Sequence, residues 1–134
     1  MCLITEQKEP IITKRGMTVY KVVERIGDDI ISPCIHFMWR QGVLEKTRIS
    51  KRIAEPRRVN YADVIAQDYY DSKLSSRNYL EISTGFHFAF KQDRLACCWG
   101  LRFYLIIMKF RIPKGSEIYK DATGLGVTNQ IMML

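Results

Sequence analysis

The sequence has no long apolar run, no regular cysteine framework and no apolar leader. Its most apolar segment, residues 103–108, is far shorter than the roughly 20 residues that cross a bilayer as a helix. Its four cysteines lack the spacing of a secreted disulfide scaffold, and residues 1–10 carry acidic and basic side chains among few hydrophobic ones. We therefore expect a cytoplasmic protein with free thiols and no membrane attachment.

Recognisable catalytic and metal-binding motifs are also missing. No Walker sequence, no Gly-x-Ser-x-Gly elbow and no His-Glu-x-x-His pair occurs, and residues 124–126 precede a strand where a dinucleotide fingerprint would open a helix. Cys34 and His36 are too close for a zinc-ligand pair, and so are the adjacent Cys97 and Cys98. We predict no catalytic residue, no metal and no cofactor.

What the sequence does have is an ordinary globular composition with an excess of positive charge. Its 134 residues are 47% hydrophobic and 26% charged, and 21 Lys and Arg against 14 Asp and Glu give a net charge of +7. A chain of this length can bury a sizeable core without a metal or a disulfide. We predict one domain that spans residues 1–134.

The positive charge is concentrated between residues 40 and 58, where seven basic residues stand against two acidic ones, a local balance of +5. Read as one strand, residues 43–53 alternate between two faces. The outer face is basic, with Leu44 beside the cations, and the inner face carries Val43, Ile49 and Ile53. Such a face favours phosphates, nucleotides or nucleic acid through charge steering and counterion release.

The predicted ligand-binding residues are those of the basic stretch and one histidine: Lys46, Arg48, Lys51, Arg52, Arg57, Arg58 and His87. Two structural alternatives stay open. Lys and Arg also guard exposed sheet edges against aggregation, so the basic stretch can be a solvated strand face. His87, between two phenylalanines, can equally be a packed, hydrogen-bonded side chain at a strand end.

The hydrophobic periodicity predicts an α+β fold with a mixed or mainly antiparallel sheet, one longer helix and one short helix. Helices are expected at residues 61–73 and 91–99. Strands are expected at residues 17–24, 43–53, 79–83, 101–112 and 127–134. The strand at 101–112 is apolar on both sides and is predicted to be central and covered on both faces. The last strand is predicted to be an exposed edge, which makes a homo-oligomer a candidate.

Four stretches, in order along the chain, resemble a set of small uncharacterised proteins encoded by bacteriophages and prophages of gut bacteria. They are residues 1–4 with 19–23, the pair 32–33, residues 85–88, and residues 112–119 leading to 129–131. The resemblance implies a viral or mobile-element origin, and therefore a place in the cytoplasm of the infected host cell.

A second likeness is to the ADP-ribosyltransferase fold. Residues 82–85 and 127–131 resemble its Ser-Thr strand and its final strand, which in that family carries a catalytic glutamate. Lys21 stands where the family has an arginine, and residues 128–130 offer no carboxylate to stabilise an oxocarbenium ion. The likeness implies a nucleotide-shaped cleft with Ser83 and His87 as cleft residues.

These observations support three hypotheses about function. The first is a non-enzymatic phage-type accessory protein that binds nucleic acid or a signalling nucleotide through its basic surface, as a counter-defence or host-takeover factor. The second is a divergent ADP-ribosyltransferase-like enzyme that acts on a nucleotide. The third is a structural protein that assembles through its C-terminal strand.

Overall fold

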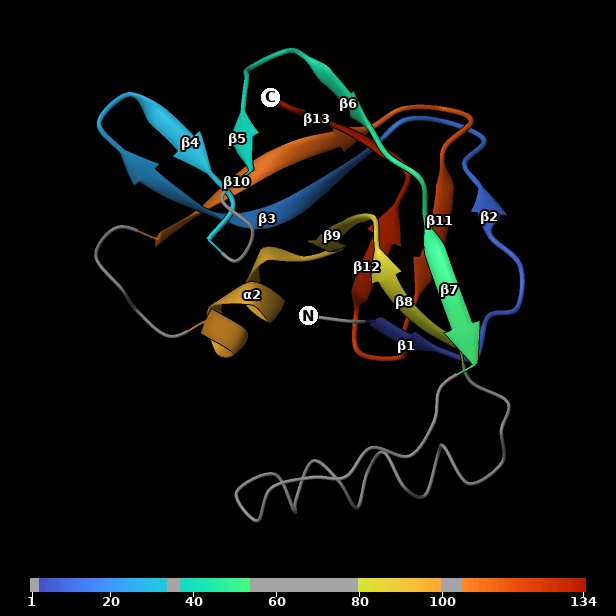
Figure 1. Cartoon of the computed structure of the whole chain (residues 1–134). Coiled ribbons are helices and arrows are strands. Elements are labelled where there is room, and N and C mark those ends of the chain that lie inside the picture. Colours follow the sequence, from blue (N-terminus) through green and yellow to red (C-terminus); the bar gives the residue numbers. More distant parts are fainter. Residues whose placement is uncertain (1–2, 34–36, 54–79, 100–104) are drawn as a thin grey trace.

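The computed structural model describes residues 3–33, 37–53, 80–99 and 105–134, and strands dominate these residues (Figure 1). The strands are β1 (Leu3–Thr5), β2 (Ile11–Ile12), β3 (Met17–Ile26), β4 (Asp29–Ile31), β5 (Met38–Trp39), β6 (Leu44–Lys46), β7 (Ser50–Ile53), β8 (Leu80–Thr84), β9 (Phe86–Ala89), β10 (Leu105–Ile112), β11 (Glu117–Lys120), β12 (Leu125–Thr128) and β13 (Gln130–Met133). The helix is α2 (Gln92–Trp99). The predicted α+β class is therefore wrong, because the described chain is β-rich with one short helix. The longer helix expected at 61–73 lies outside the described residues.

The larger sheet has ten strands and curls around one core. Its order is β2-β11-β12-β9-β3-β10-β13-β6, with β4 added to β3 and β5 to β4. Ile118 of β11 and Ile131 of β13 come from distant places in this order, yet both belong to the same buried cluster. The Gln130 side-chain amide donates a hydrogen bond to the Ser116 hydroxyl at 3.0 Å. The curvature of the sheet thus brings the first residues of β11 and β13 together.

Strands β3 and β10 form the longest antiparallel pair, with Phe110 opposite Val19. Both side chains are fully buried, and Trp39 packs edge-on against Phe110 with ring centroids 4.8 Å apart. The strand predicted at 17–24 is confirmed as β3. Of the strand predicted at 101–112, the described part forms β10, which lies inside the sheet between β3 and β13. The prediction that this strand is covered on both faces is wrong, because Ile106 and Ile107 are exposed.

The smaller sheet has the order β1-β8-β7 and packs on a second core cluster, formed by Leu3, Ile82, Tyr119 and Val127. Strand β8 contains a bulge, since Ser50 lies opposite Thr84 and Lys51 opposite Ile82, which leaves Ser83 as an extra residue. Gly85 then carries the chain into β9 of the larger sheet with a φ of 131°. A Cβ at this position would lie 2.3 Å from the Val127 side chain, so the connection requires glycine.

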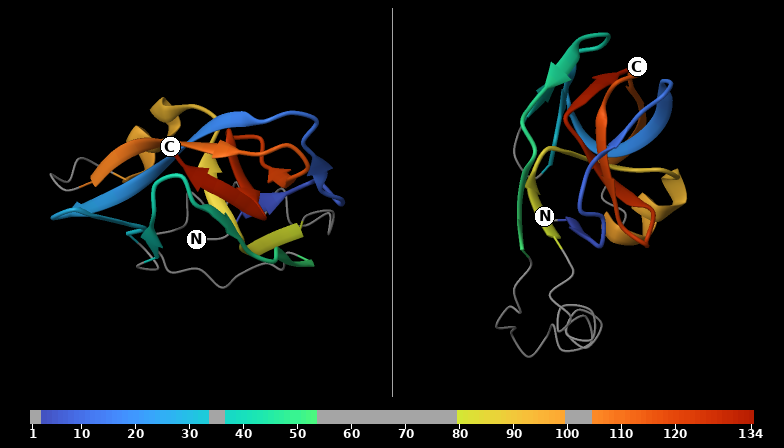
Figure 2. Two further views of the ribbon diagram at one scale, coloured as in Figure 1. Left: turned by 90° about the horizontal axis from the view of Figure 1, so that it is seen from above. Right: turned by 90° about the vertical axis from the view of Figure 1, so that its right-hand side faces the viewer.

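Helix α2 covers one region of the larger sheet. Leu95 is buried against Val22 of β3 and Ala89 of β9, and Asp93 lies in the first turn, where the helix dipole favours a negative charge. The short helix expected at 91–99 is therefore confirmed. The right-hand view of Figure 2 shows α2 on the side of the molecule opposite the segment from β6 to β7.

The C-terminal segment differs from its prediction. Residues 127–134 do not form one strand, because the chain turns at Asn129 between β12 and β13. Strand β13 lies between β10 and β6, and Ile131 and Met133 are buried. The predicted exposed C-terminal edge is therefore wrong. Among the described residues, no helix has the length and apolar character needed to span a membrane.

Candidate anion-binding surface

The basic segment predicted as one strand is two strands in two sheets. Strand β6 pairs with β13 of the larger sheet, and β7 pairs with β8 of the smaller one. Between them the Thr47 amide donates to the Asn129 carbonyl at 2.8 Å, and Ile49 packs against the second core cluster. The expected continuous strand is therefore wrong, because its two ends complete different sheets. The segment still presents its cations to solvent; the exposed ones are Lys46, Arg48, Lys51 and Arg52.

Lys51 is held in place by the second core cluster. Its ammonium donates to the Tyr119 hydroxyl at 3.2 Å and to the Lys8 carbonyl at 3.5 Å, and lies 5.7 Å from the Tyr119 ring centre. The hydrogen bond with Tyr119 raises the pKa of the Lys51 ammonium above its ordinary value of 10.5. Lys51 therefore keeps its charge at neutral pH, in a fixed position at the end of the basic segment.

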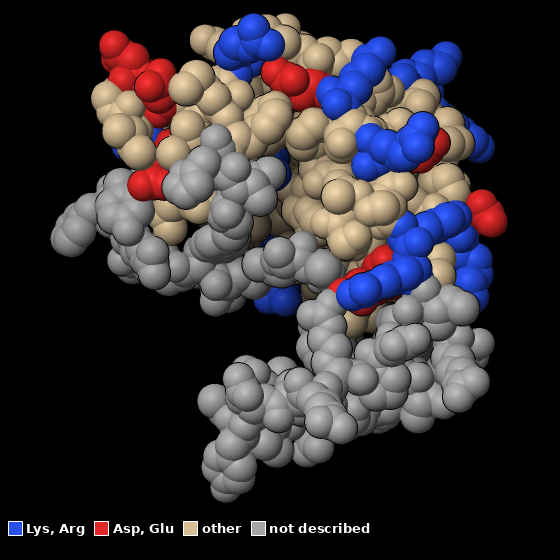
Figure 3. Space-filling model, in the orientation of Figure 1, with Lys and Arg blue, Asp and Glu red and all other residues tan. Residues whose placement is uncertain are grey.

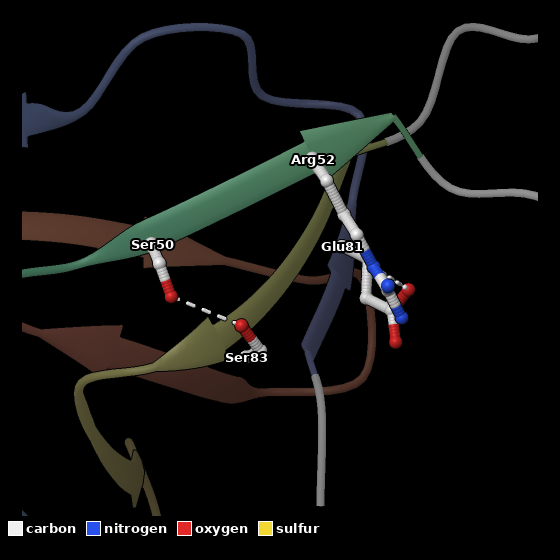
Figure 4. Close-up of polar contacts among 4 residues, drawn as sticks. All are labelled: Ser50, Arg52, Glu81 and Ser83. Carbon is white, nitrogen blue, oxygen red and sulfur yellow. Dashed lines mark hydrogen bonds and ion pairs between the residues drawn. The ribbon is translucent and has the colours of Figure 1, made fainter.

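Arg52 is compensated by a carboxylate. Its Nε lies 2.9 Å from Oε2 of Glu81, whose side chain is only 4% exposed (Figure 4). Arg40, which precedes the segment, similarly lies 3.6 Å from Glu45. These ion pairs remove part of the positive charge that the sequence places here, and they give Arg52 a structural role beside β8.

A group of hydroxyls lies further along the same two strands. The Ser50 hydroxyl contacts the Ser83 hydroxyl at 3.0 Å (Figure 4). It also hydrogen-bonds the Thr84 hydroxyl. All three residues are exposed. Because three hydroxyls carry three protons and make two mutual contacts, at least one proton is available to an outside acceptor such as a phosphate oxygen.

Three further cations, which the sequence analysis did not select, lie in two neighbouring loops. Lys14 and Arg15 follow β2, and Lys114 lies in the turn between β10 and β11; all three are exposed. The loops are joined by backbone hydrogen bonds between Thr13 and Ser116 and between Gly115 and Thr13, both of 2.9 Å.

These loops lie beside β6. Ser116 accepts a hydrogen bond from Gln130, and Gln130 lies directly opposite Lys46. The two loops and the basic segment thus meet at one side of the molecule, where Figure 3 shows Lys and Arg side chains along the top and the right-hand margin. We call this set the basic surface; its members are Lys14, Arg15, Lys46, Arg48, Lys51 and Lys114. The sequence signal for the loop cations is weak, because about a hundred residues separate Lys14 from Lys114.

His87 does not contribute charge to this surface. It lies on β9 opposite Val127, and its Nε2 is buried and has no hydrogen-bond partner among the described residues. Burial, and to a smaller extent the positive charge of Lys21, lowers the pKa of His87 from 6.5 to about 4. The imidazole is therefore neutral at physiological pH, as a packed histidine would be.

The transferase likeness predicts Ser83 and His87 as partners in one cleft. Ser83 is exposed at the bulge of the smaller sheet, whereas the imidazole of His87 is largely buried in the larger sheet. Thr128, on the strand where that family carries its glutamate, is fully buried, and its hydroxyl donates to the Gln130 carbonyl at 3.3 Å. The described geometry offers no support for a shared catalytic cleft.

Some predicted residues lie outside the described part of the chain. They are Arg57, Arg58, Cys2, Cys34 and His36, together with the side chains of Cys97 and Cys98. Within the described ranges, no three His, Cys, Asp or Glu side chains gather as a metal site would require.

Comparison of the chain with protein-family models, with curated proteins and with solved structures found no match. Its function is therefore argued from the fold and the basic surface.

Proposed function

We propose that this chain is a non-enzymatic binding protein whose basic surface holds a phosphate-rich polyanion, in the first place nucleic acid. One observation carries the proposal. Cations from three separate segments meet beside β6, and the cations at positions 14, 15, 46, 48 and 114 are exposed and form no ion pair with any described residue. Uncompensated charge gathered in this way attracts polyanions and releases their counterions on binding.

The spread of these cations favours a polymer over a single nucleotide. They extend from the loops beside β2 along β6 to Lys51 on β7, and the Ser50 hydroxyl group lies on the same stretch of chain. A repeating phosphate backbone can contact several such points at once, whereas a signalling nucleotide would contact few of them. For a chain of phage origin, binding of this kind would serve counter-defence or host takeover in the infected cell.

Edge protection is the competing explanation. Strand β6 ends the larger sheet and β7 ends the smaller one, and Lys and Arg on such strands discourage pairing with other chains. That explanation accounts for Lys46 and Lys51. It does not account for Lys114, which lies in the turn between β10 and β11, and Lys14 and Arg15 follow β2, the strand at the other end of the larger sheet.

The test is fluorescence anisotropy with labelled duplex DNA, single-stranded DNA and a cyclic dinucleotide, at a series of salt concentrations. We expect duplex binding that weakens with salt. In a Lys14→Ala, Arg48→Ala, Lys114→Ala variant, the slope of log affinity against log salt should fall by about 0.9 for each phosphate contact removed. The three alanine substitutions are also made singly, and their matched control is Lys91→Ala, at an exposed lysine beside α2.

Two results would refute the proposal: no detectable nucleic-acid binding at low salt, or binding that the triple variant leaves unchanged. Tight binding of the cyclic dinucleotide alone would replace the polymer with a small ligand. Losses in the single variants that equal the loss in Lys91→Ala would show that net charge, and not this surface, determines the affinity.

A further inference from the structure

A second surface, formed by the outward side of β10, β13 and β6, combines cations with exposed apolar side chains. Directly opposite residues of antiparallel strands share a face of the sheet. Leu44 lies opposite Met132, and Met132 lies opposite Arg111, so these three side chains form one row across three strands. Lys46 continues the face on β6, two residues after Leu44, and Lys109 continues it on β10.

The apolar members of this surface are open to solvent. Leu44 is 40% exposed and Leu134 is 44% exposed, and Met132 is half-buried between them. Leu134 extends the row on β13, where its amide donates to the Lys109 carbonyl at 3.3 Å. Single exposed aliphatic residues are common on proteins, but several on adjoining strands of one face mark an interaction surface.

All the charged side chains of this surface are positive. Lys46, Lys109 and Arg111 are exposed, and none of them forms an ion pair with a described residue. Glu45, the acidic residue of β6, lies opposite the buried Ile131 and therefore points to the other side of the sheet. A partner that covers the apolar row must bring negative charge to its rim.

The packing of helix α2 indicates that such a partner would be a helix. Helix α2 packs on this same side of the sheet. Leu95 of α2 packs on Val22 of β3, and Val22 shares its face of the sheet with Tyr20, two residues earlier. Tyr20 lies directly opposite Lys109, so Lys109 is on that face too. The helical layer covers the sheet at β9 and β3, and β10, β13 and β6 continue the sheet beyond it. A second helix laid on these strands would pack on the outer face of the curved sheet, as α2 does at another place around it.

We propose that this face docks an amphipathic helix of a partner protein, with an apolar stripe on Leu44, Met132 and Leu134 and carboxylates that meet Lys46, Lys109 and Arg111. A second copy of this chain is disfavoured, because two such faces would place like charges together. Nucleic acid is disfavoured, because three aliphatic side chains gain nothing from a phosphate backbone. The proposal does not rest on the basic surface, which this face borders at Lys46 and at Arg111, whose guanidinium lies beside Gly16.

The probe is a labelled synthetic peptide of about 18 residues, long enough to form helix, with a leucine stripe flanked by glutamates. Binding is measured by anisotropy and mapped by NMR amide shifts on the full chain. We expect shifts at β10, β13 and β6, and an affinity that falls about tenfold in a Lys109→Glu, Arg111→Glu variant and again in Leu44→Ser. The matched control, Arg48→Glu with Lys114→Glu, should bind the peptide within about twofold of the unaltered protein.

A peptide with lysines in place of the glutamates separates charge complementarity from general stickiness, and should not bind. The proposal fails if the glutamate peptide does not bind at millimolar concentration, if the lysine peptide binds equally well, or if the Lys109 and Arg111 variant keeps full affinity while circular dichroism shows it folded. It also fails if duplex DNA, and not the peptide, produces shifts on this face. Loss of DNA binding in the Arg48 and Lys114 variant, with peptide binding intact, would separate this surface from the basic one.

Discussion

At the scale of single residues, Lys21 connects the core of the larger sheet with strand β9. It lies on the core-facing side of β3 between Val19 and Val23, with its ammonium 5.4 Å from the Trp39 ring centre, and it donates a hydrogen bond to the His87 carbonyl. Strand β9 pairs with β3 only at Ala89, so the His87 carbonyl lies beyond that ladder and receives a side-chain donor in its place. A charged group near the core is thereby anchored by a backbone group that would otherwise lack a strand partner.

The neutral state of His87 predicts a pH dependence of stability. The pKa of His87 is lowered from 6.5 to about 4 in the folded protein, so between these values the unfolded chain binds a proton that the folded protein does not. The free energy of unfolding should therefore decrease as the pH falls from about 6.5 towards 4, by at most about 3 kcal/mol from this residue. The measurement is urea unfolding across this pH range.

The control is His87→Gln, which cannot titrate. It should lose less stability than the unaltered protein over the same interval, because the acidic residues titrate alike in both proteins. Identical pH profiles for the two proteins would contradict the assignment.

At the scale of elements, β7 and β8 show how one strand pair combines a structural cation with candidate binding groups. Arg52 lies against the buried carboxylate of Glu81, while Ser50 and Ser83 at the other end of the pair are open to solvent. The four residues alternate with side chains that face the second core cluster, such as Ile82. The bulge at Ser83 lies between the pair formed by Lys51 and Ile82 and the pair formed by Ser50 and Thr84.

This arrangement predicts different consequences for two neighbouring arginines. Arg52→Ala should lower the free energy of unfolding by about 1 to 3 kcal/mol, because it removes a charged hydrogen bond to a buried carboxylate. Arg48→Ala should change stability by less than about 0.5 kcal/mol, because Arg48 is exposed and forms no ion pair with a described residue. Denaturant unfolding of both variants, beside DNA binding, is the measurement; equal losses of stability would show that Arg52 has no special structural role.

At the scale of the whole molecule, the two sheets are linked, because one segment of the chain supplies an end strand to each of them. The stretch from β6 to β7 ends the larger sheet and then the smaller one, and β13 lies between β10 and β6. The core inside the larger sheet draws buried side chains from β3, β5, β9, β10, β11 and β13. Removing one internal strand should therefore disrupt the whole sheet, not one edge of it.

Truncation of residues 130–134 tests this dependence. Ile131 and Met133 are buried, and each contributes about 1.5 to 3 kcal/mol by burial, which together approaches the whole stability of an ordinary domain. We expect the truncated chain to lose its cooperative thermal transition by circular dichroism. Deletion of the exposed Leu134 alone should preserve that transition; a cooperative melt of the longer truncation would contradict the internal position of β13.

The elements that could be predicted from the sequence have a hydrophobic pattern within their own residues. Alternation is strong over 17–24, and the helix at 91–99 has apolar residues at helical spacing, so β3 and α2 were recognised. Strands β1, β2 and β11 were missed because they have two to four residues each and are strands only through their partners. The α+β prediction failed for the same reason, since segments read as loops proved to be paired.

The candidate site also has residues that the sequence could identify and residues that only the structure brings together. The cations at 46, 48 and 51 were selected by their clustering in sequence, and the structure leaves them exposed. The compensation of Arg52 by Glu81 was not predictable, because 29 residues separate them. Lys14 and Lys114 were missed, because only the pairing of their loops places them beside β6.

The sequence alone determined the excess of positive charge, its concentration between residues 40 and 58, the alternation that makes β3 and the apolar run that makes β10. These properties depend on neighbours along the chain. The tertiary structure alone decided which cations are compensated, which loops join the basic surface, and which side of β10, β13 and β6 is left uncovered. Those outcomes follow from the register and curvature of the sheets, because pairing between distant strands determines the face on which each side chain lies.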